Sequence, residues 1–203
     1  MPREKAASEG RIGNWMTTAS GRYFWPLDPR APEVCIDDIA HALSHVCRFG
    51  GHCSRFYSVA QHSVLVAHLV ERTNLPLALH ALLHDAGEAY LGDHIHPVKS
   101  ALRVLRNAID ESIGRTEWRI MRAIDEAFGL RELSADEAAI IKHADAVLLA
   151  TEARDLMGDP KWPGLPPAET ETIDPIGPGA ACAVFRRAFQ RLSERAARGT
   201  HAS

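Results

Sequence analysis

The sequence predicts an all-α protein, and three observations support this prediction. From residue 37 onward, apolar residues recur at the three-to-four-residue period of amphipathic helices. The segments Ser58-Val-Ala-Gln61 and Ser134-Ala-Asp-Glu137 have the form of capping boxes, which start helices. A strand pattern is visible only in residues 22–36, which could form a short N-terminal hairpin. We therefore expect a bundle of about seven helices.

Each expected helix has a local signal at one of its ends. Asp37 and Asp38 occupy the first turn of the first helix, where the helix dipole favours acids. Pro76 suits the first turn of the third helix, and Gly129 is a typical residue just after a helix end. Residues 158–180 are rich in proline and glycine and are expected to form a long surface loop. The expected helices cover residues 36–47, 58–72, 77–91, 97–105, 110–128, 134–157 and 181–197.

The composition is that of one soluble, folded domain. The chain has 203 residues, of which 46% are hydrophobic and 24% are charged, and its net charge is −3. We assign residues 1–21 to a flexible leader and residues 22–203 to a single domain whose motif core spans residues 37–157. The weak negative charge argues against non-specific binding to a nucleic acid polymer.

Cysteine usage and apolar runs indicate where the protein is located. Four cysteines occur without a Cys-x-x-Cys pair, which favours a reducing compartment. The N-terminus has no apolar core of a signal peptide, and the apolar stretches fall far short of the ~20 residues that a membrane-spanning helix needs. We therefore expect a cytoplasmic protein without membrane contact.

Candidate metal ligands interrupt the apolar faces of three expected helices. His62, the pair His84-Asp85 and Asp145 stand where the helical pattern favours apolar residues. Asp145 shares a helix face with Ile141, Leu148, Leu149 and position 152, so we expect its carboxylate to be largely desolvated. A carboxylate in such a place needs a cation, a metal or several hydrogen-bond donors to stay charged.

Two imidazoles and two carboxylates can bind one divalent metal ion. This mixture suits Mn, Co, Zn, Fe, Ni or Mg and does not select among them. Because two carboxylates balance the charge of the ion, the set would be formally neutral and would leave coordination positions for water and a phosphate oxygen. Taken alone, a histidine such as His62 is more often a hydrogen-bonded core residue than a metal ligand.

The four candidate ligands and their surroundings resemble the H…HD…D signature of HD-domain metal-dependent phosphohydrolases. SVAQHS resembles the first-histidine motif of that family, and LLHDAGEAYLGD resembles the second motif of its bacterial 5′-deoxynucleotidase branch. HPVK at residues 96–99 and the pair Arg48-Phe49 also match this branch. The stretch CRFGGHCSRFYSVAQHS is as similar to a phage branch that hydrolyses dATP to deoxyadenosine and triphosphate. The resemblance covers residues 37–150.

The resemblance implies roles for further residues. Glu88 and Asp93 would handle the attacking water and the leaving group. Arg48 and Lys99 would contact phosphate oxygens, and Phe49 would line the sugar or base pocket. Each residue also has a plainer interpretation: Glu88 as a surface acid, Asp93 as a turn residue, Arg48 as a C-terminal helix cation, Lys99 as a solvated lysine and Phe49 as a core residue.

The activity that the resemblance implies is metal-dependent hydrolysis at the 5′ phosphate of a (deoxy)nucleotide, with a homodimer as a possible assembly. Three alternatives stay open: a deoxynucleotide triphosphohydrolase that releases triphosphate, a two-iron oxygenase, and a non-catalytic metal- or nucleotide-binding module. The two-iron alternative arises from His94 and His96, for which surface roles are also possible. His41 and His45, which share a face of the first helix, have no assigned role.

Overall fold

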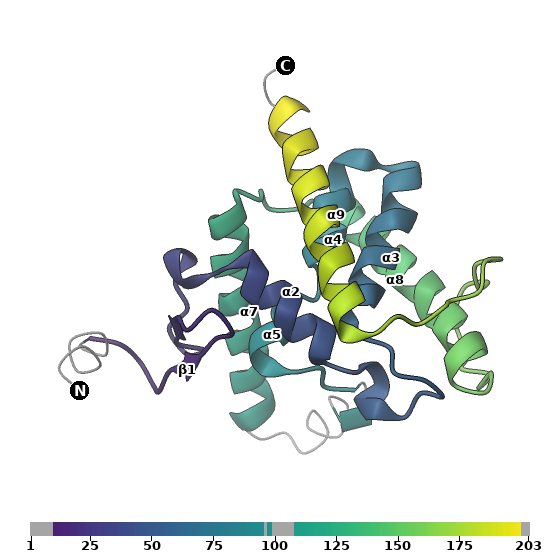
Figure 1. Cartoon of the computed structure of the whole chain (residues 1–203), viewed down its shortest axis with the longest axis horizontal. Helices are drawn as coiled ribbons and strands as arrows, with labels where there is room; N and C mark the ends of the chain where they lie inside the picture. The colour runs from purple at the N-terminus through teal and green to yellow at the C-terminus, as the bar shows by residue number, and fades with distance from the viewer. Residues whose placement is uncertain (1–9, 96, 99–107, 200–203) are drawn as a thin grey trace.

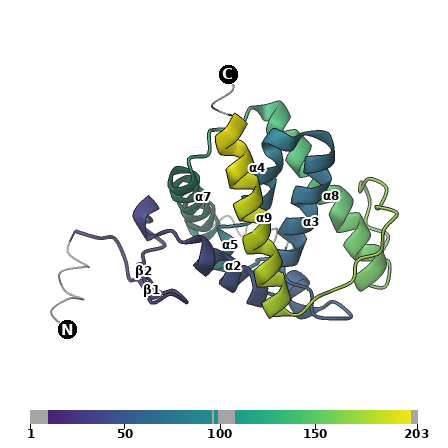
Figure 2. The same cartoon turned by 45° about the horizontal axis from the view of Figure 1, so that its top comes forward.

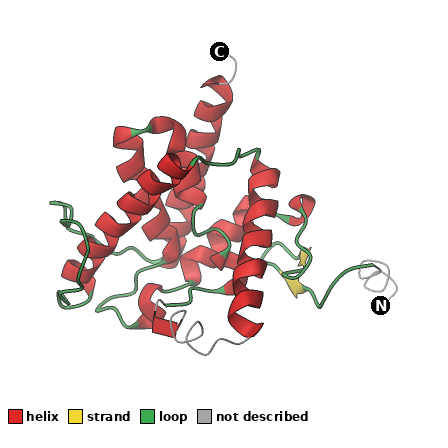
Figure 3. Cartoon of the chain, turned by 180° about the vertical axis from the view of Figure 1, so that it is seen from behind, coloured by secondary structure: helices red, strands yellow, loops and turns green. Residues whose placement is uncertain are grey.

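The structure is a computed structural model that describes residues 10–95, 97–98 and 108–199 (Figure 1). It confirms the all-α prediction, because helices dominate and the strands form one very short hairpin near the N-terminal end (Figure 3). The α-helices are α2 (Ile36–His45), α3 (Val59–Thr73), α4 (Ala78–Leu83), α5 (Glu88–Leu91), α7 (Ala108–Phe128), α8 (Ala135–Leu156) and α9 (Pro178–Gly199).

Helix α3 lies at the centre of the fold. It packs against α2, α4, α8 and α9, and Figures 1 and 2 show α9 lying across α3 and α4. His62, Val66 and Val70 of α3 are buried within this arrangement. A polar side chain on the inner face of α3 is therefore surrounded by other helices, which is where a buried ligand can be held.

The two predicted helix starts at serines are both observed, but only one is a complete capping box. The Ser134 hydroxyl accepts a hydrogen bond from the Glu137 backbone N–H, and the Glu137 carboxylate accepts one from the Ser134 backbone N–H. Ser58 accepts from the Gln61 backbone N–H in the same way. The Gln61 side chain instead reaches residues 174 and 176, so that it holds the loop before α9.

The prediction of a single helix over residues 77–91 is wrong. A 3₁₀ turn at Leu75–Leu77 leads into α4, which ends at Leu83, and α5 begins only at Glu88. Between them the backbone forms i→i−3 hydrogen bonds, for example from Glu88 N–H to the Asp85 carbonyl over 3.0 Å. The tighter turn presents His84 and Asp85 at the end of one helix and Glu88 at the start of the next.

A glycine permits the close approach of α7 to this turn. A Cβ atom added at Gly87 would lie 3.2 Å from the Met121 Sδ atom of α7, closer than side chains ordinarily pack. Ile120 and Ile124 of the same helix are fully buried. Helix α7 thus forms a wall beside the segment that carries His84 and Asp85.

A short N-terminal hairpin is observed, but not within residues 22–36 as expected, because its first strand lies in the segment that was assigned to the flexible leader. Strand β1 (Met16–Thr17) pairs antiparallel with β2 (Tyr23–Phe24). Phe24 is fully buried and stacks on Tyr90, with ring centroids 3.8 Å apart. Farther toward the N-terminus, the Arg11 guanidinium forms ion pairs with Asp28 and Glu33. Structure that contacts the core therefore extends ahead of residue 22.

The remaining element predictions differ from the structure mainly at their boundaries. Helices α7 and α9 start two and three residues earlier than expected, and most of the helix expected over residues 97–105 lies outside the described residues. The loop before α9 is held on α8, since the Asp155 carboxylate accepts from the Ile173 backbone N–H over 2.8 Å. No helix in the described part of the chain combines the length and apolarity needed to cross a membrane.

Candidate metal centre

Three of the four predicted ligands converge at one point between α3, α8 and the turn after α4. The Nε2 atom of His84 lies 3.2 Å from the Asp85 Oδ2 atom, and the Nε2 atom of His62 lies 3.6 Å from the same oxygen. One possible ligand atom from each of the three side chains lies within 4.8 Å of the other two. His62, His84 and Asp85 could therefore hold a metal ion.

The other ring nitrogen of each histidine is already used. The Nδ1 atom of His84 lies 2.7 Å from the Ala81 carbonyl oxygen, and the Nδ1 atom of His62 lies 2.6 Å from Glu152 Oε1. A carbonyl and an ionised carboxylate only accept hydrogen bonds, so both Nδ1 atoms donate. In the neutral ring this fixes the tautomer whose Nε2 atom carries a free lone pair.

Both Nε2 atoms are buried and lack a hydrogen bond of good geometry, although carboxylate oxygens lie close to them. Buried polar nitrogens without hydrogen bonds are rare and call for an explanation. Nitrogen and oxygen ligands that share a metal at about 2.0–2.2 Å must stand roughly 3 Å apart, as these do. The donor set therefore fits a metal ion.

Asp145 stands beside this group. Its Oδ1 atom lies 3.2 Å from the Nε2 atom of His62, the distance expected for two ligands of one ion. Its side chain is 40% exposed, so its carboxylate is only partly desolvated, less than the helical pattern predicts. Burial would raise the pKa of Asp145, but the hydrogen bond and charge of His62 and the charge of His84 lower it. The fully buried acid of α8 is Glu152, two turns farther along, because the helix passes from the open edge of the site into the core.

Glu152 and Arg48 complete the charged cluster. The second oxygen of Glu152 accepts from an Arg48 Nη atom over 3.0 Å, and the other Nη atom lies 3.8 Å from Asp85. The three carboxylates Asp85, Asp145 and Glu152 outweigh the one guanidinium by two negative charges. A divalent cation would neutralise this difference, which is a second sign that the cluster fits a metal.

The pKa shifts of the cluster follow from the same imbalance. Burial alone opposes protonation of His84, but the Asp85 carboxylate outweighs this effect and raises the pKa of His84 to about 9. Burial would raise the pKa of Asp85, yet His84, His62 and Arg48 together hold it well below its usual range. The pKa of His62 is raised because the carboxylates of Glu152 and Asp145 outweigh burial and the repulsion from Arg48. In the metal-free protein, protons thus supply part of the missing positive charge.

The two predicted catalytic acids lie next to this centre. Glu88 is only 8% exposed and starts α5, directly after the turn that carries Asp85. Asp93 follows Gly92, whose φ of 80° ends α5 by turning the chain away. Asp93 is half-buried and contributes to the raised pKa of Arg48, which places its carboxylate near the same guanidinium.

The predicted substrate residues have mixed outcomes. Arg48 belongs to the cluster, as described above. Phe49 is half-buried, has a left-handed φ of 58°, and its ring lies 5.3 Å from the Arg48 guanidinium carbon. Lys99 and His96 lie outside the described residues. The rings of His41 and His45 lie tilted against each other along α2, with centroids 4.3 Å apart, and His94 lines a very small cavity together with Glu88.

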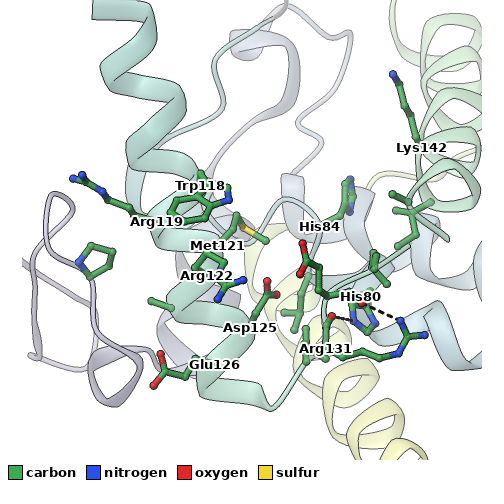
Figure 4. A pocket seen from close by; sticks show the side chains of 18 of the residues that line it. His80, His84, Trp118, Arg119, Met121, Arg122, Asp125, Glu126, Arg131 and Lys142 are labelled. Carbon is green, nitrogen blue, oxygen red and sulfur yellow. Dashed lines mark hydrogen bonds between the residues drawn. The ribbon is translucent and has the colours of Figure 1, made fainter. Parts of the chain in front are cut away.

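A pocket of about 1100 Å³ opens beside the metal ligands. His84 and Asp145 belong to its lining, so the candidate metal position is reached from it (Figure 4). Its walls come from α7 and α8, and Figure 4 shows Trp118, Met121 and Arg122 of α7 on the side facing His84. The volume is in the range of small-molecule sites. Among the described residues, the lining does not include Arg48, Phe49, Glu88 or Asp93.

Sequence reasoning missed the role of Glu152. The available signal was its position seven residues after Asp145, two helical turns along the apolar face that carries that predicted ligand. It also missed Tyr57, a fully buried side chain in which burial and the nearby Glu152 carboxylate raise the pKa of the phenol. Both residues come close to the cluster only through tertiary packing, which no local pattern encodes.

Comparison with known proteins identifies relatives that match most of the chain. No family model matches the sequence. The uncharacterized protein YfdR of Escherichia coli (strain K12) is 39% identical over 186 residues, which cover 89% of this chain and 97% of YfdR. The uncharacterized protein RCAP_rcc00048 of Rhodobacter capsulatus is 39% identical over 151 residues, or 71% of this chain and 74% of that protein. This chain therefore belongs to the family of YfdR.

Proposed function

We propose that this protein is a metal-dependent phosphohydrolase that cleaves the 5′ phosphate of a (deoxy)nucleotide and releases the nucleoside and phosphate. The observation that carries the proposal is the convergence of His62, His84 and Asp85 with both Nδ1 atoms already hydrogen-bonded elsewhere. Asp145 is the proposed fourth ligand, because its Oδ1 atom lies beside His62 Nε2. The resemblance of HDAGEAYLGD to the 5′-deoxynucleotidase branch of HD-domain enzymes supports the substrate class.

Each proposed step has a side chain near the centre. A bound divalent ion would lower the pKa of a coordinated water and polarise a phosphoryl oxygen. Glu88 would accept the proton of the attacking water, and Asp93 would protonate the leaving oxygen. Arg48 would hold a phosphate oxygen with nitrogen atoms that Glu152 does not use, since one Nη atom contacts that carboxylate and the other lies 3.8 Å from Asp85.

Among the described residues, Arg48 is the basic side chain in contact with the proposed ligand Asp85, and a single such cation suits a monophosphate better than a triphosphate. A triphosphate brings about four negative charges and would need several cations beyond the metal. Arg48 already shares its charge with Glu152, and Arg55 pairs with Asp174 at the surface over 3.2 Å. The triphosphohydrolase is the second candidate, because the ~1100 Å³ pocket next to His84 has room for the larger substrate and has four basic side chains in its lining.

The test is a nucleotide screen on metal-stripped protein to which Mn²⁺, Co²⁺, Zn²⁺ or Fe²⁺ is returned. We expect orthophosphate from dAMP, whereas intact triphosphate from dATP with dAMP untouched would reverse the ranking of the two candidates. Release from no nucleotide with any of these metals would exclude nucleotide hydrolysis. Two irons per chain with oxygen consumption would instead indicate the oxygenase.

Matched variants connect the activity to the proposed ligands. His62→Ala and Asp145→Ala should lose both the bound metal and the activity, because each variant removes a side chain that supplies part of the metal-binding free energy. His68→Ala on α3 and His143→Ala on α8 are the controls, since both residues are exposed on the same two helices. Full metal occupancy in Asp145→Ala, measured by elemental analysis, would remove Asp145 from the ligand set.

A further inference from the structure

Glu152 is the most deeply buried acid of the molecule's charged cluster, and each of its oxygens has one defined partner. Oε1 accepts from His62 Nδ1 over 2.6 Å, and Oε2 accepts from Arg48 over 3.0 Å. The side chains of Glu152 and His62 are both 0% exposed. Desolvating a carboxylate is costly unless hydrogen-bond donors compensate its charge, so the two donors constrain the position of Glu152 and Glu152 constrains theirs.

The two partners of Glu152 have different expected tasks. His62 is a proposed metal ligand on α3, and Arg48 is the candidate phosphate-binding cation after α2. Arg48 also approaches Asp85, another ligand, at 3.8 Å. One carboxylate from α8 thus joins the Arg48 segment and α3, whose partner residues lie 104 and 90 positions from Glu152 in the sequence.

We propose that Glu152 is a positioning residue of the metal centre: through one oxygen it holds His62 in the tautomer that offers Nε2 to the ion, and through the other it fixes Arg48 beside the site. The proposal rests on the proposed metal-dependent function. A carboxylate that accepts from the distal nitrogen of a ligand histidine orients the ring and raises its basicity, and the loss of such a partner typically weakens metal binding by 10–100-fold.

An acid of the same helix that lies outside the cluster provides the control. The Asp155 side chain is 7% exposed, pairs with Arg154 and accepts from the Ile173 backbone N–H, and within the described part of the chain it forms no hydrogen bond or ion pair with a proposed ligand. Asp155→Asn should therefore lower stability without changing metal affinity. A general effect of removing a buried carboxylate from α8 would appear in both variants, whereas a positioning effect appears only at Glu152.

The variants are chosen so that a folding defect cannot imitate the result. Glu152→Gln keeps the shape and one acceptor oxygen. Arg48→Met alone and the double variant Arg48→Met with Glu152→Leu form a matched pair. The double variant removes both buried charges, which leaves stability nearly unchanged more often than removing one of them. Because neither protein contains the Arg48 guanidinium, a difference between them reports the effect of the Glu152 carboxylate and not that of an unpaired buried cation.

Two readouts test the proposal. Competition with a chromophoric chelator gives the dissociation constant for Co²⁺ and Zn²⁺, and long-range ¹H–¹⁵N NMR of the metal-free protein at alkaline pH reports which nitrogen of neutral His62 carries the proton. We expect Nδ1–H in the wild type, a mixture of tautomers when Glu152 is Leu, and dissociation constants raised about 10–100-fold in the Glu152 variants. Asp155→Asn should match the wild type in both readouts.

Three outcomes of these measurements would contradict the proposed positioning role of Glu152, and one would contradict the metal site itself. Metal affinity within about threefold of the matched parent together with an unchanged tautomer would show that Glu152 does not position His62, and so would an equal loss in Asp155→Asn. A wild type that binds neither ion, but whose His62 tautomer still depends on Glu152, would identify the metal proposal as the part that fails. An Nε2–H tautomer in the wild type would exclude the positioning role itself.

Discussion

Glu152 and Glu71 are each held by two basic side chains that are distant in sequence, but they lie in opposite environments. Glu152 is fully buried between His62 and Arg48. Glu71 lies near the surface of α3, where it pairs with Arg191 and Arg195 of α9, whose side chains are 44% and 46% exposed.

The difference teaches what each cluster contributes. Surface ion pairs gain little, because water and salt screen both charges. Buried charges cost much desolvation free energy and are weak evidence for stability, so what this cluster contributes has to be tested separately. The surface cluster is thus one more contact between α3 and α9, whereas the buried cluster marks the candidate metal centre.

The largest expected effect comes from removing one member of the buried cluster. Glu152→Leu leaves the Arg48 guanidinium buried without its main partner, and we expect the free energy of unfolding to fall by about 3–5 kcal/mol. Urea unfolding of the metal-free protein measures this change, and adding Arg48→Met should recover most of it. A loss below about 1 kcal/mol would mean that water reaches Arg48 and that the buried cluster responds to mutation like a surface ion pair.

A second prediction concerns Glu88, which is buried beside the same centre but is assigned a chemical task. Glu88→Gln preserves size and removes the base, so we expect the metal to remain bound while turnover falls by about 10²–10⁴-fold. Elemental analysis and single-turnover kinetics separate the two effects. Turnover within a few-fold of the wild type would make Glu88 a structural acid.

A third prediction uses the raised pKa of His84. A group whose pKa is higher in the folded than in the unfolded chain contributes stability at low pH that is lost as the pH rises. In the metal-free protein we therefore expect a loss of stability between about pH 6.5, the usual pKa of histidine, and about pH 9, the folded value. Metal binding must displace that proton, so the stabilisation by added Zn²⁺ or Co²⁺ should grow over the same range.

Thermal unfolding from pH 6 to 9.5, with and without metal, measures both trends. His68→Ala serves as the control, because His68 is exposed and lies outside the centre. Parallel curves with and without metal would contradict the linkage between His84 and the ion.

The smallest effect is expected at the surface cluster. Glu71→Gln should lower the free energy of unfolding by about 0.2–1 kcal/mol, and the loss should shrink at high salt because the pairs are exposed. Metal affinity should not change. A salt-independent loss comparable to that of the Glu152 variant would show that exposure does not separate the two clusters.

Much of the fold could be predicted because its signals are local. The serine caps at Ser58 and Ser134 and the helix end at Gly129 all depend on residues within one turn. The break after Leu83 was not predicted, because the apolar pattern continues through LLHDAGEAYL while the backbone tightens into i→i−3 bonds. Gly87, which allows Met121 of α7 to approach, has no sequence signal that separates it from an ordinary helix glycine.

In the candidate site, too, the residue types could be predicted from the sequence but their tertiary contacts could not. Histidine and aspartate at positions where the helical period favours apolar residues were sufficient to select His62, His84, Asp85 and Asp145. The exposed fraction of Asp145 was mispredicted, since helical periodicity gives the direction of a side chain but not which neighbours cover it. Arg48 was selected for its resemblance to a phosphate-binding residue. Its contact with Glu152 joins residues that are 104 positions apart, so no local pattern could predict it.

The sequence by itself determined the helical class, most helix starts and the ligand types, because hydrophobic period, caps and side-chain chemistry are properties of short segments. Only the tertiary structure decided which nitrogen of His62 is committed to Glu152, where Arg48 directs its charge and which pocket opens onto His84 and Asp145. The physical reason is that hydrogen bonds and desolvation act over about 3 Å in space. Such contacts join residues without regard to their separation along the chain, and they exist only once α3, α4 and α8 have packed together.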